Sequence, residues 1–215
     1  MNDSVRRRGR PARLSQDAIL LAAQEIVESA GIDALTMRAV ADQLSSSPMA
    51  IYRHVRDKQE LLLLLLDRVI ATLERPELPA DPRQRLVVLW RFLHDELVAH
   101  PWVVGVLACD FGGRSILWLI EEILQAFLAC GRTVEQAGAA YRAVWQYTVG
   151  VLTIRIAAER TTSALDRPSC RTATIASADP EQTPTIAALA GEWPHAFDNY
   201  DFGLHALLDG LLLRP

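Results

Sequence analysis

The sequence has little lysine, little cysteine and no long apolar run. Lys58 is the single lysine against 21 arginines, a skew typical of a GC-rich genome. The three cysteines have no short spacing and are odd in number, which excludes a disulfide framework and a zinc site. They are Cys109, Cys130 and Cys170, and unpaired thiols favour a reducing cytoplasm.

Segments that would cross or enter a membrane are also missing. The run Leu61–Leu66 is flanked by charges and is far shorter than the roughly 20 apolar residues of a membrane helix. The basic N-terminus is followed by no apolar segment, so it is no signal peptide. We therefore expect a soluble cytoplasmic protein with no membrane partner.

Sequence motifs of catalysis are absent as well. The chain holds no G-x-S-x-G, P-loop or H-E-x-x-H pattern. Glu121 and Glu122 are adjacent, so they face different sides of a helix. No two of the five histidines stand three or four residues apart; they are His54, His94, His100, His195 and His205. We expect neither an enzyme nor a cofactor.

Positive charge is concentrated at one end of the chain. The net charge is −4, yet residues 1–14 hold five arginines against Asp3. Residues 61–215 hold 13 arginines against 18 acidic residues. A basic arm on an acidic body suggests that one end of the chain meets a polyanion. We expect residues 1–14 to form a disordered basic arm.

Helical spacing extends over nearly the whole chain, and strand signals are nearly absent, so we predict an all-α fold. Near the N-terminus, Ser15 caps an amphipathic helix that Gly31 ends, and Thr36 caps a second, shorter helix. Ser47 and Pro48 begin a third helix that runs to about His54. This three-helix bundle is followed by a connecting helix that Asp57 caps.

Three prolines in residues 75–82 mark a domain boundary. We predict a smaller N-terminal domain over 15–73, connecting helix included, and a larger helical domain over 74–215. Residues 161–185 read as a long mobile loop, with a short helix possible near 184–190. The remaining helices are expected at about 83–99, 101–109, 114–130, 133–160 and 193–213.

The second and third helices form a helix-turn-helix pattern, in which a short recognition helix enters the DNA major groove. Ile51 and Val55 are four residues apart and point into the bundle. The residues left facing outward toward base edges are Pro48, Met49, Ala50 and Arg53. Three others reach the phosphate backbone from the flanks, namely Tyr52, His54 and Lys58.

The stretch Leu35–Leu62 resembles the DNA-binding domain of the tetracycline-repressor (TetR) family, and the match covers about residues 13–70. The resemblance implies that Arg38 reads a base and that Thr36 joins the phosphate-binding positions. Arg53 stands where the tetracycline repressor has an aromatic residue, so a different operator is expected. The family's usual turn glycine is replaced by Ser45, which can form the turn with a negative φ.

The basic arm contains Arg8-Gly9-Arg10-Pro11, which resembles an AT-hook core lying in a narrow minor groove. The alternative is a solvated tail. Because the arm directly precedes the helix-turn-helix, we favour accessory DNA contacts by Arg6, Arg7, Arg8 and Arg10.

The family resemblance implies a homodimer, with two recognition helices about one DNA turn apart. The last helix supports this, because its apolar residues cover more than one face. They are Phe202, Leu204, Leu207, Leu208, Leu211 and Leu212. The alternative is a monomeric core.

The resemblance also implies a small effector bound among the helices of the large domain. These helices place apolar and a few polar groups on shared faces, as ligand sites do. The candidates are Trp90, His94, Leu107, Leu117, Glu121, Leu124, Tyr141, Trp145 and Thr148. Each could equally belong to an ordinary core.

Residues 98–108 and 147–152 resemble the C-terminal domain of the tetracycline repressor itself. Where that repressor holds a metal with a histidine, this chain has an apolar residue near Leu107, so no metal is expected. We predict a repressor released from its operator by a small hydrophobic effector. The alternative is a ligand-free regulator whose large domain only dimerises or binds a protein partner.

Overall fold

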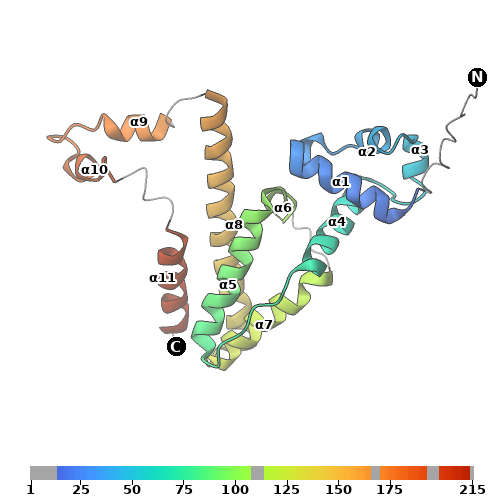
Figure 1. Ribbon diagram of the computed structural model, residues 1–215. Helices are drawn as coiled ribbons and strands as arrows, with labels where there is room; N and C mark the ends of the chain where they lie inside the picture. The colour runs from blue at the N-terminus through green and yellow to red at the C-terminus, as the bar shows by residue number, and fades with distance from the viewer. Residues whose placement is uncertain (1–13, 108–113, 166–169, 193–198, 214–215) are drawn as a thin grey trace, which may run out of the picture. The chain divides into compact units, whose positions relative to one another are not determined.

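The computed structural model describes residues 14–107, 114–165, 170–192 and 199–213. Within these ranges the chain is helical and contains no strand, which confirms the all-α prediction (Figure 1). The chain divides into two compact units, residues 1–71 and 72–215. No helix among the described residues is long and apolar enough to cross a membrane.

The first unit contains α1 (Gln16–Ala30), the 3₁₀ turn η1 (Ile32–Ala34), α2 (Met37–Gln43), α3 (Pro48–Ile51) and α4 (Lys58–Thr72). Its helices begin where side-chain oxygens accept backbone N–H groups that would otherwise lack a partner. Ser15, Thr36 and Ser47 cap α1, α2 and α3 in this way. Asp57 accepts the Glu60 N–H at 2.8 Å and starts α4.

The turn between α2 and α3 depends on one residue with positive φ. Ser45 has φ 48°, so the expectation of a negative φ there is wrong. The reason is the end of α2, where Ser46 N–H bonds to Ala41 O at 2.8 Å and Ser45 N–H to Asp42 O at 3.1 Å. This pair of bonds is a Schellman motif, which requires a left-handed residue and usually has glycine.

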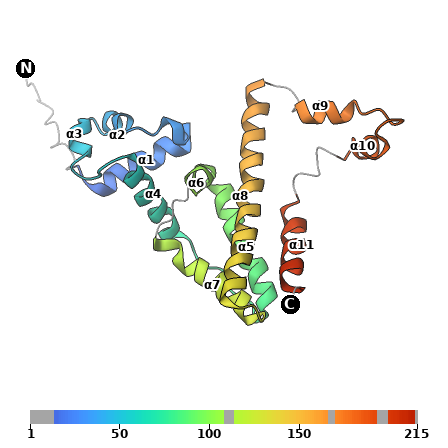
Figure 2. The ribbon, with the colours of Figure 1, turned by 180° about the vertical axis from the view of Figure 1, so that it is seen from behind.

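The second unit contains α5 (Pro82–Ala99), α6 (Pro101–Leu107), the 3₁₀ turn η2 (Arg114–Ile116), α7 (Leu117–Ala129), α8 (Val134–Leu165), α9 (Cys170–Ala176), α10 (Pro184–Leu189) and α11 (Tyr200–Leu213). Helix α5 packs on α7, and α7 packs on α8. Helix α11 lies beside both α5 and α8, as Figures 1 and 2 show. Trp90, Phe127 and Leu204 are fully buried among these helices.

Three helix boundaries differ from the sequence expectation. The segment 161–185 is not one long loop, because α8 continues to Leu165 and α9 occupies Cys170–Ala176. Helix α3 ends at Ile51 rather than His54, and residues 52–54 form turns instead. Helix α11 begins at Tyr200, and residues 193–198 lie outside the described ranges. The short helix near 184–190 is confirmed as α10.

Candidate DNA-binding surface and effector-binding core

The recognition helix α3 is a single turn held from one side. Ser47 Oγ accepts the Ala50 N–H at 3.3 Å, and Pro48 occupies the first helical position. Ile51 and Val55 are 0% and 1% exposed, so they anchor the turn in the core of the bundle. A short helix held this firmly presents the remaining side chains in a fixed direction.

Those remaining side chains include the predicted base-reading residues. Met49 is 69% exposed, Pro48 and Arg53 are exposed, and Ala50 is half-buried. Arg38 on α2 is also exposed and lies 3.9 Å from Asp42, a loose pair that costs little to break. The structure therefore leaves this set of side chains open to a groove-sized partner.

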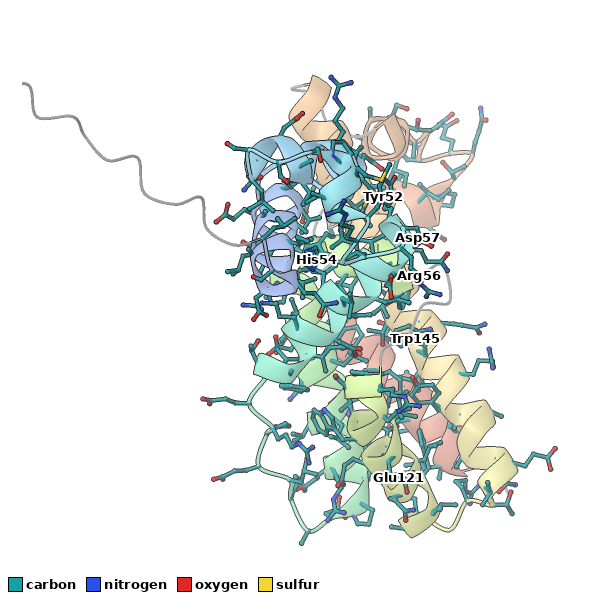
Figure 3. All side chains as sticks on the ribbon, turned by 90° about the vertical axis from the view of Figure 1, so that its right-hand side faces the viewer. Tyr52, His54, Arg56, Asp57, Glu121 and Trp145 are labelled. Carbon is teal, nitrogen blue, oxygen red and sulfur yellow. The ribbon has the colours of Figure 1, made fainter. Side chains whose placement is uncertain are left out.

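Of the predicted phosphate-binding residues, Tyr52 and His54 follow α3 (Figure 3), Lys58 is the first residue of α4, and Thr36 precedes α2. Tyr52 is 47% exposed and His54 is exposed. Thr36 Oγ1 already accepts the Ala39 N–H at 3.0 Å, so its hydroxyl proton remains available to a phosphate. Lys58 is half-buried, and its ammonium donates to Ile32 O at 3.2 Å. An ammonium has three donors, so this bond leaves others for DNA.

Arg56 lies between the predicted positions and was missed by sequence reasoning. Its side chain is 83% exposed and pairs with Glu60 at 3.3 Å (Figure 3). The four arginines predicted in the arm, Arg6, Arg7, Arg8 and Arg10, lie outside the described residues.

The predicted effector residues divide into two groups. Trp90 is fully buried, and Tyr141 and Trp145 are half-buried. The ring centroids of Trp90 and Tyr141 are 5.6 Å apart, and those of Tyr141 and Trp145 are 6.4 Å apart. Leu107 and Leu124 are half-buried. By contrast, Leu117 is 58% exposed. Glu121 is also exposed and accepts a hydrogen bond from Gln125. Figure 3 shows Glu121 well apart from Trp145. The subunit alone does not bring these two into the core.

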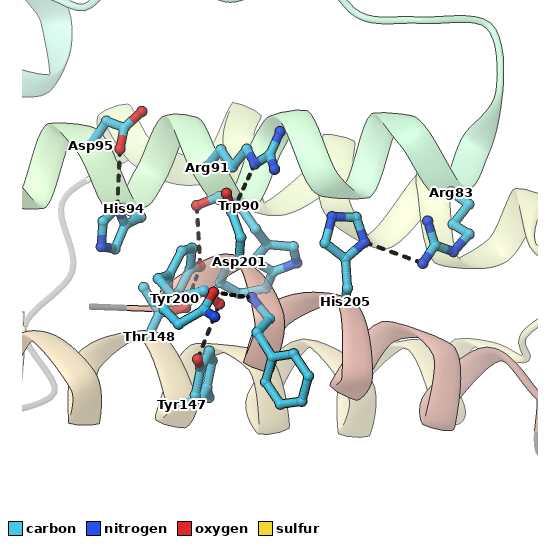
Figure 4. A network of polar contacts seen from close by, with 12 residues as sticks. Arg83, Trp90, Arg91, His94, Asp95, Tyr147, Thr148, Tyr200, Asp201 and His205 are labelled. Carbon is cyan, nitrogen blue, oxygen red and sulfur yellow. Dashed lines mark hydrogen bonds and ion pairs between the residues drawn. The ribbon is translucent and has the colours of Figure 1, made fainter. Parts of the chain in front are cut away.

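His94 and Thr148 belong to a polar network that joins α5, α8 and α11 (Figure 4). Buried Tyr200 contacts Thr148 Oγ1 at 2.9 Å through its hydroxyl and donates to Trp90 O at 3.3 Å. Its ring stacks on His94, with centroids 4.0 Å apart. Burial raises the pKa of the Tyr200 hydroxyl, so the group stays protonated and can donate.

The partner of the buried Thr148 could have been anticipated, since a buried hydroxyl requires one. Nothing in the sequence says that Tyr200, 52 residues away, supplies it. Tyr147 adds a second tie, because its hydroxyl donates to Tyr200 O at 3.1 Å.

Two clefts lined by described residues lie along α5 and α11. One, of about 560 Å³, is lined by Leu78, Arg83, Val87, Arg91 and His205, among others. The other, of about 230 Å³, is lined by Arg91, His94 and Tyr200, among others. Ion pairs of Arg83 with Asp209 and of Arg91 with Asp201 cross this contact. The arginines are thus already neutralised by α11.

Among the described residues no group of His, Cys, Asp or Glu could hold a metal ion.

A three-helix bundle with a short, exposed recognition helix, followed by a larger helical unit, defines a helix-turn-helix DNA-binding regulator. Two family models match this chain and agree with that class of protein. Residues 19–65 match the family described as "Bacterial regulatory proteins, tetR family". Residues 75–214 match "Tetracyclin repressor-like, C-terminal domain".

Individual proteins are similar over nearly the whole chain. The transcriptional repressor DrrR1 of Streptomyces coeruleorubidus is 31% identical over 95% of this chain and 79% of its own length. The Streptomyces coelicolor regulator ActR in complex with actinorhodin superimposes with a TM-score of 0.73 at 25% identity, covering 94% of this chain and 96% of ActR. BioQ of Mycobacterium smegmatis, with its double-stranded operator, shares the fold at 24% identity and a TM-score of 0.66, covering 94% and 100%.

The chain belongs to the TetR family of bacterial regulatory proteins and has a tetracycline-repressor-like C-terminal domain. The family consists of transcriptional regulators rather than catalysts, which confirms the expectation that this is not an enzyme.

Proposed function

We propose that the protein is a dimeric cytoplasmic repressor that a small hydrophobic effector releases from its operator. The observation that carries this proposal is the geometry of α3, in which Ile51 and Val55 are sealed while Met49 and Arg53 stand exposed. Such a turn fits the entry of a few exposed side chains into the major groove.

The side chains divide by task. Arg38, Pro48, Met49, Ala50 and Arg53 face base edges in this proposal. Arg53 is the strongest candidate for direct readout, because a guanidinium can pair with both acceptors of a guanine edge. Thr36, Tyr52, His54 and Lys58 bind phosphates and set the register of the protein on the duplex. The arginines of the N-terminal arm add minor-groove contacts.

Two copies of the head are required to read a two-fold operator, and TetR-family regulators are typically dimeric. We assign the dimer contact to α8 and α11. Exposed apolar side chains occur on both helices, with Ile154 59% exposed on α8 and Phe202 and Leu213 72% and 81% exposed on α11. Large apolar side chains this exposed indicate a surface that a second subunit covers.

The effector site is assigned to the core of the large unit, around Trp90, His94, Leu124, Tyr141, Trp145 and Thr148. The half-buried Tyr141 and Trp145 offer ring faces, and the buried Thr148 hydroxyl, which donates to Val144 O and contacts Tyr200, belongs to the same core. ActR, which shares the fold over 94% of this chain, has been crystallised with actinorhodin. That likeness supports a small-molecule ligand here without naming it.

Release requires that the effector bind the operator-competent and the released states with different affinities. Helix α4 runs from the DNA-binding unit to Thr72, where the large unit begins, so it is the covalent route for such a change. We propose that effector binding moves α4 and thereby changes the spacing of the two heads.

The test uses the full-length protein and an operator selected from random-sequence duplex DNA. Fluorescence anisotropy gives the Kd for that operator with and without fractions of an extract of the source organism. We expect at least one small-molecule fraction to weaken binding tenfold or more. If operator binds tightly and no bound small molecule changes the Kd, the effector assignment is wrong and the ligand-free regulator replaces it.

A further inference from the structure

Two tryptophans of the large unit bury an indole N–H that no described residue accepts. Trp90 on α5 is 0% exposed and Trp102 on α6 is 5% exposed, and the Nε1 of each is buried without a hydrogen-bond partner. A buried unpaired donor costs about 1–3 kcal/mol. Native proteins pair most buried donors with a protein group or ordered water, so each donor left unpaired calls for an explanation.

Trp90 differs from Trp102 in its surroundings. It stands at the inner end of an aromatic row, which we define as Trp90, Tyr141 and Trp145. The Tyr141 and Trp145 rings are nearly parallel, with 8° between their planes, and both are half-buried. No ring contact joins Trp102 to this row among the described residues. The row therefore combines flat apolar surfaces with one unpaired donor.

The chemistry of the row restricts what can bind. Flat rings favour an aromatic ligand, because offset-stacked and edge-on aromatic contacts add to apolar burial. Burial raises the pKa of the Tyr141 hydroxyl, so all three side chains of the row are neutral. A charged ligand would lose its hydration against these three neutral side chains, none of which supplies a counter-charge. Indole nitrogen is a donor only, so the ligand must supply the acceptor.

We propose that the aromatic row binds a flat, uncharged aromatic molecule bearing a carbonyl oxygen, and that the Trp90 indole N–H donates to that oxygen. The proposal rests on the effector function above and specifies its chemistry. The Trp90 nitrogen is sealed in this structure, so the ligand reaches it only after the surrounding side chains move apart. The liganded conformation therefore differs from this one, which is the condition for a ligand to shift an equilibrium between states.

A matched pair of probes tests the donor. Fluorene and 9-fluorenone have the same three flat rings, and they differ in a methylene that is replaced by a carbonyl. Equilibrium dialysis with the full-length protein gives the Kd of each. One hydrogen bond contributes about 0.5–1.5 kcal/mol net, so fluorenone should bind about two- to tenfold more tightly.

Substitution then assigns the donor. Trp90→Phe reduces the aromatic surface of the row, so both probes should bind more weakly, but fluorenone should lose more and the ratio of the two Kd values should fall to about one. Trp102→Phe is the matched control, because it deletes an equally buried unpaired N–H outside the row, and it should keep the preference. If Trp90 had only a structural role, Trp90→Phe would raise the Kd of both probes by the same factor and leave their ratio unchanged. Three outcomes would overturn the proposal. The wild type binds both probes with equal affinity, the preference for fluorenone survives in Trp90→Phe, or the preference is lost in Trp102→Phe.

Two further measurements distinguish a failure of this site from misfolding of the variant and from a failure of the effector function. If Trp90→Phe does not fold, the indole N–H resonances of the ¹⁵N-labelled wild type are measured instead. Fluorenone should shift one of these resonances downfield, and fluorene should not. The absence of that difference overturns the proposal. Operator affinity is measured separately. Trp90-dependent binding of fluorenone with an unchanged operator Kd would contradict the effector function while leaving this site in place.

Discussion

At the scale of single residues, the two cations of the DNA-binding surface have different surroundings. Arg53 is exposed and makes no ion pair with a described residue. Lys58 is half-buried, and Ile32 O holds its ammonium at the start of α4. A free guanidinium can align with a base edge, whereas an ammonium fixed near a helix N-terminus suits a phosphate.

Arg53→Ala should therefore relax specificity, and Lys58→Ala should not. We expect Arg53→Ala to lose about 1–3 kcal/mol of discrimination at one base pair. Lys58→Ala should weaken all duplexes about equally and reduce the slope of log Kd against log salt by about one. Anisotropy titrations over a set of single-base operator variants measure both. An equal loss across all variants for Arg53→Ala would remove Arg53 from base readout.

Ser45 carries backbone strain that glycine would relieve. Its φ of 48° lies in the left-handed region, which costs a residue with a side chain roughly 1 kcal/mol. Ser45→Gly should raise the free energy of unfolding by about that amount, measured by denaturant titration. Ser46→Gly is the control, because Ser46 has no positive φ and should gain nothing. A destabilised Ser45→Gly would show that the serine side chain contributes more than the strain costs.

At the scale of elements, α11 is placed by a close contact with α8. A Cβ built on Gly203 would overlap the hydroxyl end of the Tyr147 side chain, so the absence of a side chain at residue 203 lets α11 approach α8 with Tyr147 in this position. The same hydroxyl donates to Tyr200 O. Gly203 is therefore a packing requirement even though it interrupts a helix, where glycine costs about 1 kcal/mol relative to alanine.

The contact predicts opposite effects of one substitution in two backgrounds. Gly203→Ala in the wild type should destabilise by about 1–3 kcal/mol, because the methyl group overlaps Tyr147. In a Tyr147→Ala background the same change should be neutral or stabilising by up to about 1 kcal/mol, because alanine favours helix. Thermal and denaturant unfolding of the four proteins measure the cycle. The same sign in both backgrounds would contradict the Gly203–Tyr147 contact.

At the scale of the whole molecule, the exposed face of α11 predicts subunit association. Phe202, Ala206 and Leu213 are spaced four and seven residues apart, so they lie on one side of the helix. Phe202→Glu should convert a dimer to a monomer, because it would bury an unpaired charge. Sedimentation velocity measures the change. Leu21→Glu, on a leucine of α1 that is 48% exposed, is the control and should stay dimeric.

Two results would contradict the dimer contact. One is a wild type that sediments as a monomer at micromolar concentration, and the other is a Phe202→Glu variant that remains dimeric with unchanged affinity. A monomeric variant should also bind the operator far more weakly, since it loses the second recognition helix.

The DNA-binding unit was largely predictable because its signals are local. Ser15, Thr36, Ser47 and Asp57 all cap the helices expected of them. Capping depends on residues three apart, so it can be read from the chain. The end of α3 and the turn at Ser45 were exceptions, and the sign of φ at Ser45 follows from hydrogen bonds back to α2 rather than from serine itself.

The sequence alone determined the helical class, the DNA-binding unit and its family, because periodicity and capping are short-range properties. Only the tertiary structure decided which predicted effector residues meet. It separated Glu121 and Leu117 from the buried Trp90, joined Thr148 to Tyr200, and left the Trp90 nitrogen without a partner. Burial and long-range hydrogen bonds depend on how helices far apart in the chain pack, and no local pattern specifies that packing.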